Sequence, residues 1–264
     1  MRQQDTICDF STSDSWVVLS PIEQSIKKKI EAVGTLLKDW DIQINYGIKT
    51  GCNEAFIIST EKRKEILDNC QTEDERKRTA ELIRPILRGR DIKKYGYVEN
   101  GLFLINTHNG IRGKLPRIDI NDYPAVKAHL DRYWDKISAR ADKGDTPYNL
   151  RNCAYLEDFN KPKIIYPDIC TFLSFELDTS CFYLSNTAYF LITEKEEHLK
   201  YFLRVLNSSV MDWYYRTLSV QLGEKAVRMF SIYVLNIPIP PISDEPIEEI
   251  LKLSKEEKLF ISGG

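Results

Sequence analysis

Helix-like and strand-like segments follow one another along this chain in an irregular order, and this order constrains the fold most. The first helical segment starts with a capping box, in which Ser20 stands three residues before Glu23 and Pro21 takes the first helical position. Apolar residues then recur at helical spacing, which predicts a helix over roughly residues 21–39. The later strand-like runs lack the regular βαβ rhythm of a doubly wound sheet. The sequence therefore predicts an α+β (mixed α/β) fold, with an irregular mixed sheet and flanking helices.

The other expected elements follow from the same periodicities. Strands are expected over residues 41–46, 55–59, 101–108, 163–169, 171–178 and 187–193, and an extended segment over 231–242. Further helices are expected over residues 72–87, 121–142 and 195–218, the last of them broken near 207–209, and in the polar C-terminal segment.

Composition excludes several classes of protein. The 264 residues can bury a substantial core, and no run of about 18 apolar residues that could cross a membrane occurs. The first residues contain no apolar core of a signal peptide. The cysteines are scattered without a C-x-x-C pair, which favours a reducing cytoplasm over disulfides or a zinc site. They are Cys8, Cys52, Cys70, Cys153, Cys170 and Cys181.

Charge is unevenly distributed although the net charge is only −2. Between Arg84 and Arg117, eight basic residues stand against two acidic ones, a surplus of six positive charges. The C-terminal segment is acidic in compensation. A basic sector on a nearly neutral chain indicates one face that meets a polyanion, although a solvated loop region has the same composition.

Motifs for catalysis or cofactor binding are absent from the sequence. It contains no G-x-G-x-x-G and no P-loop, and its histidines (His108, His129 and His198) stand far apart. The segment "YPDICTFLSFELD" partly matches a nuclease P-D…E-x-K pattern through Asp168 and Glu176, but an acid, Asp178, occupies the lysine position. The sequence therefore predicts no catalytic residue, metal site or cofactor site in this chain.

Polar side chains are instead concentrated in loops that contain glycine. In "NYGIKTGCNEAFII", Gly47 and Gly51 bracket Lys49 and Thr50, and Asn53 follows. Lysine suits a phosphate, and threonine and asparagine suit short contacts to phosphate or base. Asn53 has the alternative role of capping the turn through its own side chain. The glycines are expected to be backbone requirements rather than contacts.

Two further loops carry arginines. In "RGRD", Arg88 and Arg90 flank a glycine, and a guanidinium binds phosphate oxygens or the O6/N7 edge of guanine in two-point fashion. We expect Asp91 or phosphate to hold Arg90 and Arg88 to be freer to reach DNA. The segment "SARADKGDTPYNLRNCAY" combines arginines, amides and an aromatic residue, which together suit base-edge contacts and stacking.

Six segments together carry a resemblance to a known family. "YGIKTGCNEAFII", "RGRDIKKY", "RADKGDTPYNLRNCAY", "KPKIIYPDI", "FLRVLNSSVMDWYY" and "NIPIPPI" resemble, in this order, the TaqI-like C-terminal specificity domain. This family forms the target recognition part of adenine-specific DNA methyltransferases and of type II restriction–modification enzymes. The resemblance implies a fold of the target-recognition-domain type and binding to double-stranded DNA. The candidate DNA-binding residues are Lys49, Thr50, Asn53, Arg88, Arg90, Lys93, Arg140, Lys143, Tyr148, Arg151, Lys161 and Lys163.

The resemblance also implies what the chain lacks. Full enzymes of this kind carry an N-P-P-Y-type motif that holds the flipped adenine, and this chain has none. We therefore interpret it as a C-terminal fragment whose partner is an N-terminal methyltransferase domain of the same polypeptide, which binds S-adenosylmethionine. The expected organisation is an N-terminal tail over residues 1–15, a DNA target recognition domain over 16–245 and a C-terminal helix or tail over 246–264. Whether the parent enzyme also cleaves DNA is left open.

Two other functions stay open from the residues alone. The aromatic "MDWYYRTL" and the acidic C-terminal segment would suit a protein–protein module that positions catalytic domains, and the incomplete carboxylate pattern would suit an independent nuclease. If the chain binds DNA, we expect the basic residues of the three loops to converge on one concave face. They are Lys49, Arg88, Arg90, Arg140, Lys143 and Arg151.

Overall fold

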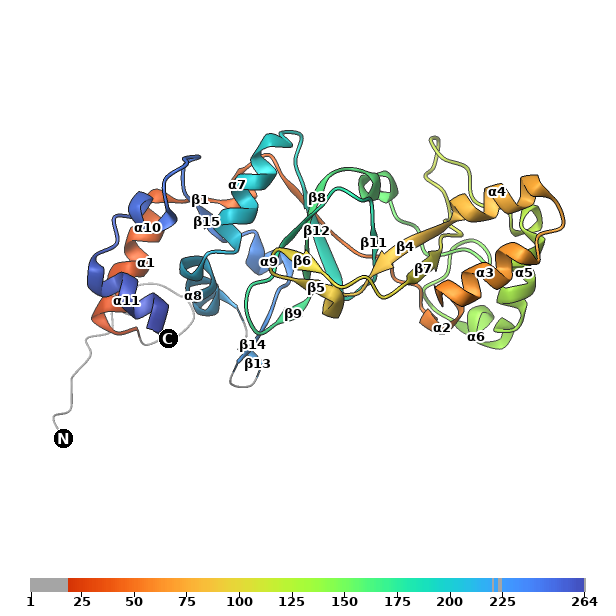
Figure 1. Ribbon diagram of the computed structural model, residues 1–264, viewed down its shortest axis with the longest axis horizontal. Coiled ribbons are helices and arrows are strands. Elements are labelled where there is room, and N and C mark those ends of the chain that lie inside the picture. Colours follow the sequence, from red (N-terminus) through yellow and green to blue (C-terminus); the bar gives the residue numbers. More distant parts are fainter. Residues whose placement is uncertain (1–18, 220, 223–224, 264) are drawn as a thin grey trace. The chain divides into compact units, whose positions relative to one another are not determined.

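The computed structural model describes residues 19–219, 221–222 and 225–263, and its fold is mixed α+β, as the sequence predicts (Figure 1). Two compact units divide the chain. The first unit holds residues up to 42, residues 170–173 and those from 200 onward, and the second holds residues 43–169 and 174–199. The predicted N-terminal tail, residues 1–15, lies outside the described residues.

The first element that the structure describes in the first unit is α1 (Pro21–Val33), whose start follows from its capping box. The backbone N–H of Ser20 donates to Oε2 of Glu23 at 2.7 Å, which satisfies one of the unpaired donors of the first turn. The predicted end near residue 39 is wrong, because the helix stops before Gly34. A Cβ at Gly34 would lie 2.4 Å from the Cβ of Pro238, so only glycine allows the chain to pass here.

After Gly34 the backbone pairs with a distant segment instead of continuing the helix. β1 (Thr35–Leu36) is antiparallel to β15 (Pro238–Ile239), and the 3-10 helix η1 (Leu37–Asp39) follows it. After β12 (Ala188–Ile192), the described helices and strands before β15 and after it are two helices of ten residues, two antiparallel strands and three further helices. They are α7 (Glu197–Leu206), α8 (Ser209–Leu218), β13 (Gln221–Leu222), β14 (Ala226–Arg228), α9 (Ser231–Val234), α10 (Ile247–Ile250) and α11 (Lys255–Gly263). The predicted extended segment 231–242 thus starts with a helical turn and is a strand only at β15.

The predicted break in the helical segment 195–218 is confirmed. Ser208 separates α7 from α8, and its hydroxyl accepts a hydrogen bond from the backbone N–H of Met211 at 3.2 Å. This N-cap starts a new helix where the previous one has ended.

The C-terminal helix α11 is fastened to α1 by one buried carboxylate. Glu257 accepts hydrogen bonds from Nζ of Lys29 at 2.6 Å and from Oγ of Ser25 at 2.7 Å. Burial by itself would raise the pKa of Glu257, but these contacts outweigh it and lower the pKa to about 2. The carboxylate is therefore ionised at neutral pH and joins the two ends of the unit.

The second unit contains two four-stranded sheets. The first has the order β10-β8-β12-β2, with antiparallel neighbours throughout. Its inner strand β8 is buried along its whole length, although the strand begins with a lysine, Lys163. The strands are β2 (Gln43–Tyr46), β8 (Lys163–Pro167), β10 (Glu176–Asp178) and β12 (Ala188–Ile192).

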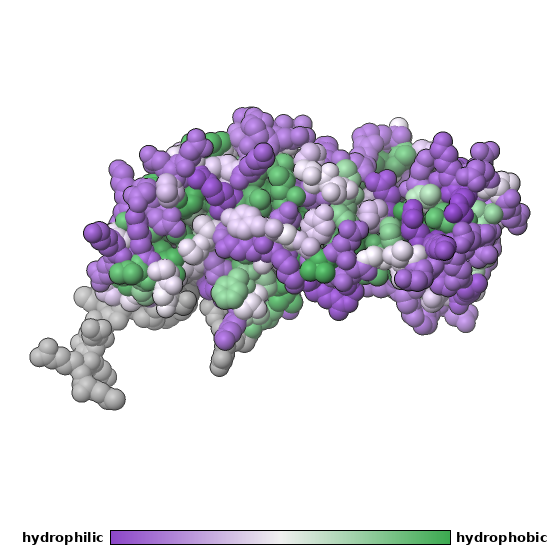
Figure 2. All heavy atoms as spheres, in the orientation of Figure 1, coloured by the Kyte–Doolittle hydropathy of each residue, from purple (hydrophilic) through white to green (hydrophobic). Residues whose placement is uncertain are grey.

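The second sheet has the order β11-β4-β7-β3, in which only the β11–β4 pair is parallel. Its strands are β3 (Ile57–Ser59), β4 (Ile83–Leu87), β7 (Leu102–Ile105) and β11 (Tyr183–Leu184). Short helices precede or follow these strands, and over α3 to α6 the visible face is mainly hydrophilic (Figure 2). They are α2 (Asn53–Phe56), α3 (Thr60–Asp68), α4 (Glu73–Leu82), α5 (Pro124–Asp131) and α6 (Trp134–Ala139).

Several predicted boundaries in this unit are corrected. The helix expected over 72–87 ends at Leu82, and the remaining residues form β4, because Pro85 has no N–H for a helix and disfavours helical backbone before it. The strand expected over 55–59 begins only at Ile57. The helix expected over 121–142 is two helices, and α3 was not predicted at all.

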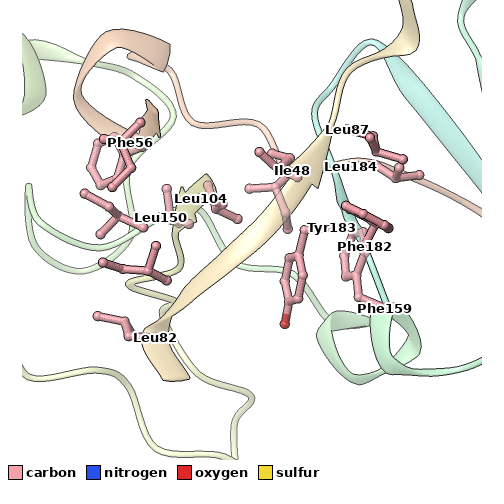
Figure 3. Packing of buried hydrophobic residues seen from close by; sticks show 14 of the residues in the cluster. Ile48, Phe56, Leu82, Leu87, Leu104, Leu150, Phe159, Phe182, Tyr183 and Leu184 are labelled. Atoms are coloured by element: carbon pink, nitrogen blue, oxygen red, sulfur yellow. The ribbon is translucent and has the colours of Figure 1, made fainter. Parts of the chain in front are cut away.

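Buried side chains of both sheets form one hydrophobic cluster in the second unit (Figure 3). Phe159 stacks on Tyr183, with ring centroids 4.7 Å apart, and contacts Phe190 at the same centroid distance. Ile48, Leu87 and Leu184 meet at one end of β4 (Figure 3). The loops that leave this point are therefore anchored on a packed core.

The remaining short elements connect these parts. They are η2 (Gly89–Asp91), β5 (Ile92–Lys93), β6 (Gly96–Tyr97), η3 (Ile120–Asp122), η4 (Leu156–Asn160) and β9 (Ile169–Cys170). Among the described residues, no helix combines the length and the apolar character needed to cross a bilayer.

Candidate nucleic-acid interface

The loop between β2 and α2 depends on its two glycines, as predicted. A Cβ at Gly47 would lie 2.0 Å from the carbonyl oxygen of Ser185, and Gly51 has a φ of +67°. Thr50 is 1% exposed, and its hydroxyl donates to Oδ1 of Asn53 at 2.6 Å. Thr50 therefore shapes the turn and has no surface to offer DNA, while Asn53 is exposed and keeps part of its amide outside this bond.

Arg140 joins this loop to the segment that follows α6. Its guanidinium donates to the carbonyl oxygens of Thr50, Asp142, Pro147 and Asn149. The carbon Cζ also lies 4.4 Å from the centre of the Phe56 ring. Arg140 is 7% exposed, so the predicted DNA contact is corrected to a structural role.

Burial lowers the pKa of Arg140 to about 10, and the group remains charged at neutral pH. A buried cation that satisfies four carbonyl groups fixes the backbone of two loops that lie far apart in the sequence. The loops that carry Lys49 and Arg151 are thus held together from inside.

On the surface of these loops one carboxylate is shared by two cations. Oδ2 of Asp142 lies 2.9 Å from Nζ of Lys49, and Oδ1 lies 3.4 Å from a guanidinium nitrogen of Arg151. The two basic side chains are 46% and 51% exposed. Hydrogen bonding to Lys49 is the main cause that lowers the pKa of Asp142. We call Lys49, Asp142 and Arg151 the Asp142 cluster.

Lys143 and Tyr148 lie in the same segment. Lys143 is exposed and donates to the carbonyl oxygen of Ser138 at 2.7 Å. The hydroxyl of half-buried Tyr148 donates to Oδ1 of Asp131 at 2.6 Å, and its ring centre lies 5.4 Å from that of Trp134. Trp134 is 44% exposed and adds an aromatic surface that the sequence did not single out.

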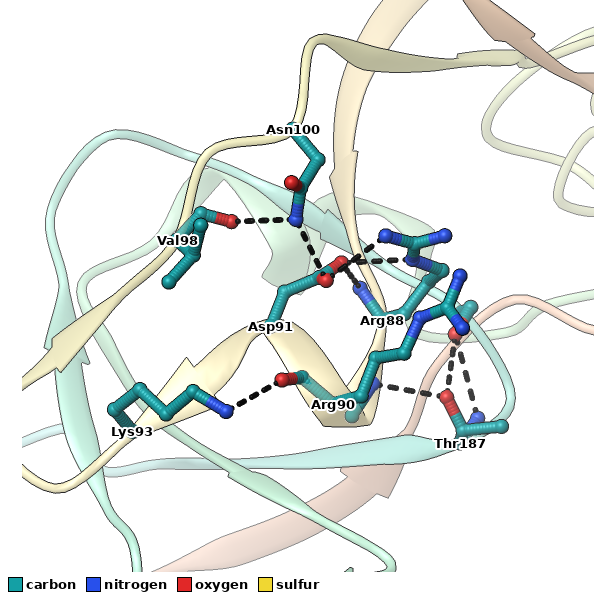
Figure 4. Close-up of polar contacts among 9 residues, drawn as sticks. Arg88, Arg90, Asp91, Lys93, Val98, Asn100 and Thr187 are labelled. Atoms are coloured by element: carbon teal, nitrogen blue, oxygen red, sulfur yellow. Dashed lines mark hydrogen bonds and ion pairs between the residues drawn. The ribbon is translucent and has the colours of Figure 1, made fainter.

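The turn that contains Arg88 and Arg90 reverses the predicted pairing (Figure 4). Arg88, not Arg90, pairs with Asp91, through Nε and a terminal nitrogen that donate at 2.9 Å to the two carboxylate oxygens. Asn100 donates to the same carboxylate at 2.8 Å. Burial would raise the pKa of Asp91, but its contacts with Arg88 outweigh burial and lower the pKa. The reason for the reversal is a capping box, in which Asp91 also accepts the backbone N–H of Arg88.

Gly89 approaches another loop rather than being free to approach a ligand. Its added Cβ would lie 2.1 Å from the carbonyl oxygen of Thr187, and its N–H donates to the hydroxyl of Thr187 at 2.9 Å. Arg90 is exposed, and in the described part of the chain its guanidinium has no hydrogen bond or ion pair. Lys93 is also exposed and donates to the carbonyl oxygen of Arg90 at 2.8 Å. Arg90 and Lys93 are therefore the available cations of this turn.

Lys161 and Lys163 lie two residues apart and differ completely in environment. Lys161 is 47% exposed and pairs with Asp158 at 3.0 Å. Lys163 and Asp178 are both fully buried side chains and pair at 2.6 Å across β8 and β10. Burial lowers the pKa of Lys163, and Asp178 opposes this shift. The prediction that Lys163 contacts DNA is therefore wrong, because its ammonium group is fully buried beside Asp178.

The residues that precede the Lys49 loop and the Arg88 turn are hydrogen-bonded to the same segment, residues 184–185. The N–H of Ile48 donates to the carbonyl oxygen of Leu184 at 2.6 Å, and the N–H of Ser185 donates to that of Leu87 at 2.9 Å. Asp142 thus connects Lys49 with Arg151 through its side chain and Arg140 through its carbonyl oxygen, and the Arg88 turn begins where Leu87 contacts the same segment. Arg140 lies beneath the surface and Arg88 is held by Asp91, so convergence on one concave face stays a prediction for the exposed cations, Lys49, Arg90, Lys143 and Arg151.

A groove of about 870 Å³ lies beside these loops. It runs between the hairpin 109–117, which turns at Gly110 and Gly113 with φ of +75° and +76°, and the segment 145–154. Arg112, Lys114 and Arg117 line it; the last two pair with Glu157 and Asp145. These arginines and this lysine belong to the basic sector of the sequence but were not among the candidate contacts.

The two arginines of the turn should respond differently to mutation. Arg88→Ala should lower the free energy of unfolding by about 1–3 kcal/mol, because the buried carboxylate of Asp91 loses its two-point partner. Arg90→Ala should change it by less than about 0.5 kcal/mol, because the side chain is exposed. Urea denaturation measures both values, and equal losses for the two variants would contradict the assignment of Arg88 as the structural member.

The comparisons with known proteins agree with the resemblance seen in the sequence. Residues 84–239 match the TaqI-like C-terminal specificity domain, and the chain belongs to this family. Its sequence is similar to type II methyltransferases, and its fold is similar to that of type IIL and IIG restriction–modification enzymes.

Two curated relatives show how the chain corresponds to longer proteins. The chain is 23% identical over 237 residues to Type II methyltransferase M.PaeR7I of Pseudomonas aeruginosa, covering 89% of this chain and 38% of that protein. It is 22% identical over 222 residues to Type II methyltransferase M.BanIII of Aneurinibacillus aneurinilyticus, covering 81% and 37%. The chain thus spans less than two fifths of the length of these relatives.

Solved structures share the fold. The type IIL restriction–modification enzyme MmeI, determined in complex with DNA, matches with a TM-score of 0.55 and 15% identity over 77% of this chain and 25% of that chain. The type IIG restriction endonuclease BpuSI matches with a TM-score of 0.54 and 16% identity over 90% and 27%.

Proposed function

We propose that the chain recognises a short sequence in double-stranded DNA, as the specificity domain of a restriction–modification DNA (adenine-N6) methyltransferase. Membership of the specificity-domain family supports this proposal. The single observation that carries it in this chain is the division of the predicted basic residues into two groups. Buried Arg140 and Lys163 hold the loops and the sheet, whereas Lys49, Arg151 and Arg90 present their charges on loop surfaces.

Each exposed group has a chemistry that suits DNA. Lys49 and Lys93 would bind phosphate as point charges, and Arg90 and Arg151 would bind phosphate or the O6/N7 edge of guanine. Lys143, Lys161, Asn53 and Tyr148 would add contacts at the edges of this surface. Lysines and arginines on a rigid scaffold fix the position of the duplex, and a subset of contacts reaches the bases.

Methyl transfer belongs to a different part of the proposed enzyme. The relatives named as type II methyltransferases are more than twice as long as the region that they share with this chain. In the proposal, an N-terminal methyltransferase domain of the same polypeptide binds S-adenosylmethionine and flips out the adenine. The enzyme would act in the cytoplasm, where both domains contact the same DNA.

Titration of DNA binding with salt tests the proposal. Binding of the chain to a labelled duplex should weaken steeply as salt rises, with a slope of about −0.9 in the log–log plot for each phosphate contact. A chain that only positions catalytic domains would show no such binding. If the chain does not bind the duplex even at low salt, the proposed function is refuted and a protein–protein role is favoured.

A further inference from the structure

We propose that Asp142 determines the selectivity of DNA binding by occupying, in the free protein, the position of a DNA phosphate between Lys49 and Arg151. This inference rests on the proposed function. The carboxylate keeps two DNA-facing cations engaged until a well-placed phosphate replaces it, and it thereby weakens binding to DNA that fits poorly.

The geometry supports exchange between carboxylate and phosphate. Each oxygen of Asp142 serves one cation, at 2.9 Å from Nζ of Lys49 and 3.4 Å from the guanidinium of Arg151. A phosphodiester likewise offers two non-bridging oxygens that share one negative charge, and both cations bind phosphate as well as carboxylate. The Lys49 and Arg151 side chains are about half exposed and that of Asp142 is 21% exposed, so water and DNA reach the cluster.

Arg140 holds the loop that carries Asp142 through the backbone of that loop. The carbonyl oxygen of Asp142, not its side chain, accepts the hydrogen bond from buried Arg140 at 2.9 Å. In the described part of the chain, the side chain of Asp142 pairs only with Lys49 and Arg151. The side chain of Asp142 therefore contacts the two cations that would otherwise bind DNA.

Asp91 shows what a structural carboxylate looks like in the same unit. It is 3% exposed and accepts from the side chain and backbone of Arg88 and from Asn100. Such a buried set of bonds does not exchange with a ligand, because breaking it leaves an uncompensated charge. The half-exposed pairs of Asp142 are weak by comparison and exchange easily.

The test compares two variants that each remove one negative charge. Asp142→Asn keeps the shape of the side chain, and Asp68→Asn is the matched control, since Asp68 pairs on the surface with Arg76 at 3.1 Å. Binding of the full chain to a duplex of arbitrary sequence is measured over a salt series. Asp142→Asn should bind about threefold to tenfold more tightly than wild type, as expected for releasing two exposed ion pairs. Its salt slope should steepen by about one to two, while Asp68→Asn should stay within about twofold.

A third variant shows whether the gain passes through the two cations. The triple variant, Asp142→Asn with Lys49→Met and Arg151→Met, should bind the duplex no more tightly than wild type. Equal affinities of Asp142→Asn and Asp68→Asn would overturn the inference, and so would a gain that survives in the triple variant. Those results leave the proposed function standing, provided that wild type binds the duplex with a steep salt slope. Absence of duplex binding by every variant would refute the proposed function, and this inference with it.

Discussion

Replacement of Lys163 by methionine should lower the free energy of unfolding by about 3–5 kcal/mol, which is the range for breaking a buried ion pair. Methionine fills a similar volume but leaves the charge of Asp178 inside the sheet. Within the described ranges, Asp178 then keeps only the hydrogen bonds from the backbone N–H groups of Ser180 and Phe182, at 2.8 and 3.0 Å. The carbonyl oxygen of Phe159 also loses its donor, which lies at 2.7 Å. Urea denaturation of the chain measures the loss.

The neighbouring lysine provides the control for this experiment. Lys161→Met removes an ion pair whose lysine is 47% exposed, so the expected change is below about 1 kcal/mol. Lys161→Met and Lys163→Met also distinguish a structural role from a role in DNA binding, because of these two lysines only Lys161 is available to a ligand. A loss below about 1 kcal/mol for Lys163→Met would show that the buried pair with Asp178 does not hold the sheet.

Arg140→Met should lower the free energy of unfolding by about 2–4 kcal/mol and should also weaken DNA binding. The substitution leaves the carbonyl groups of two loops without their shared donor, and unsatisfied buried groups are costly. Loss of this donor releases the Lys49 loop from the segment that carries Arg151. Both effects should therefore appear together, in denaturation and in duplex binding.

A lysine at position 140 should not restore the stability and the DNA binding that depend on Arg140. An ammonium group cannot reach the carbonyls of Thr50, Asp142 and Asn149 at once, because it lacks the planar fork of a guanidinium. Arg140→Lys should therefore resemble Arg140→Met. The control is Arg132→Met, which removes a 61% exposed partner of Glu65 and should change stability by less than about 1 kcal/mol. Full stability of Arg140→Lys would contradict the role assigned to the fork.

Local signals in the sequence predicted the parts of the fold that depend on neighbouring residues. The capping box at Ser20 and Glu23 started α1, and the break near residues 207–209 is formed by the N-cap Ser208. Gly51, with a φ of +67°, meets a requirement of its own turn. Such signals act within one turn, so they need no knowledge of the rest of the chain. Gly47 differs, because the distant carbonyl oxygen of Ser185 is what excludes a side chain there.

Contacts between distant residues were not visible in the sequence. Lys163 reads as a surface lysine beside Lys161, and only the pairing of β8 with β10 brings Asp178 to it. The sequence likewise gave no reason to place Arg140 under the Lys49 loop or to connect Lys49 with Asp142.

Arg88 and Arg90 illustrate the same limit at short range. Both flank Gly89 and both could pair with Asp91, which lies nearest in sequence to Arg90. The backbone of the turn decides the outcome, because a capping box places Asp91 against the N–H and the guanidinium of Arg88. The helix expected over 72–87 ends early because of Pro85, and residues 83–85 pair instead with the distant strand β7.

Selection from a pool of randomised duplexes tests most directly whether this chain recognises a DNA sequence. The chain is mixed with the pool, bound duplexes are recovered and amplified, and the rounds are repeated at rising salt to suppress contacts that involve phosphate alone. One short sequence should become enriched, and Arg140→Met, with its loops released, should enrich it far less than Arg132→Met or wild type. A pool that stays random through all rounds, with the wild-type chain folded and still bound to DNA, would contradict sequence recognition and leave only a general affinity for phosphate.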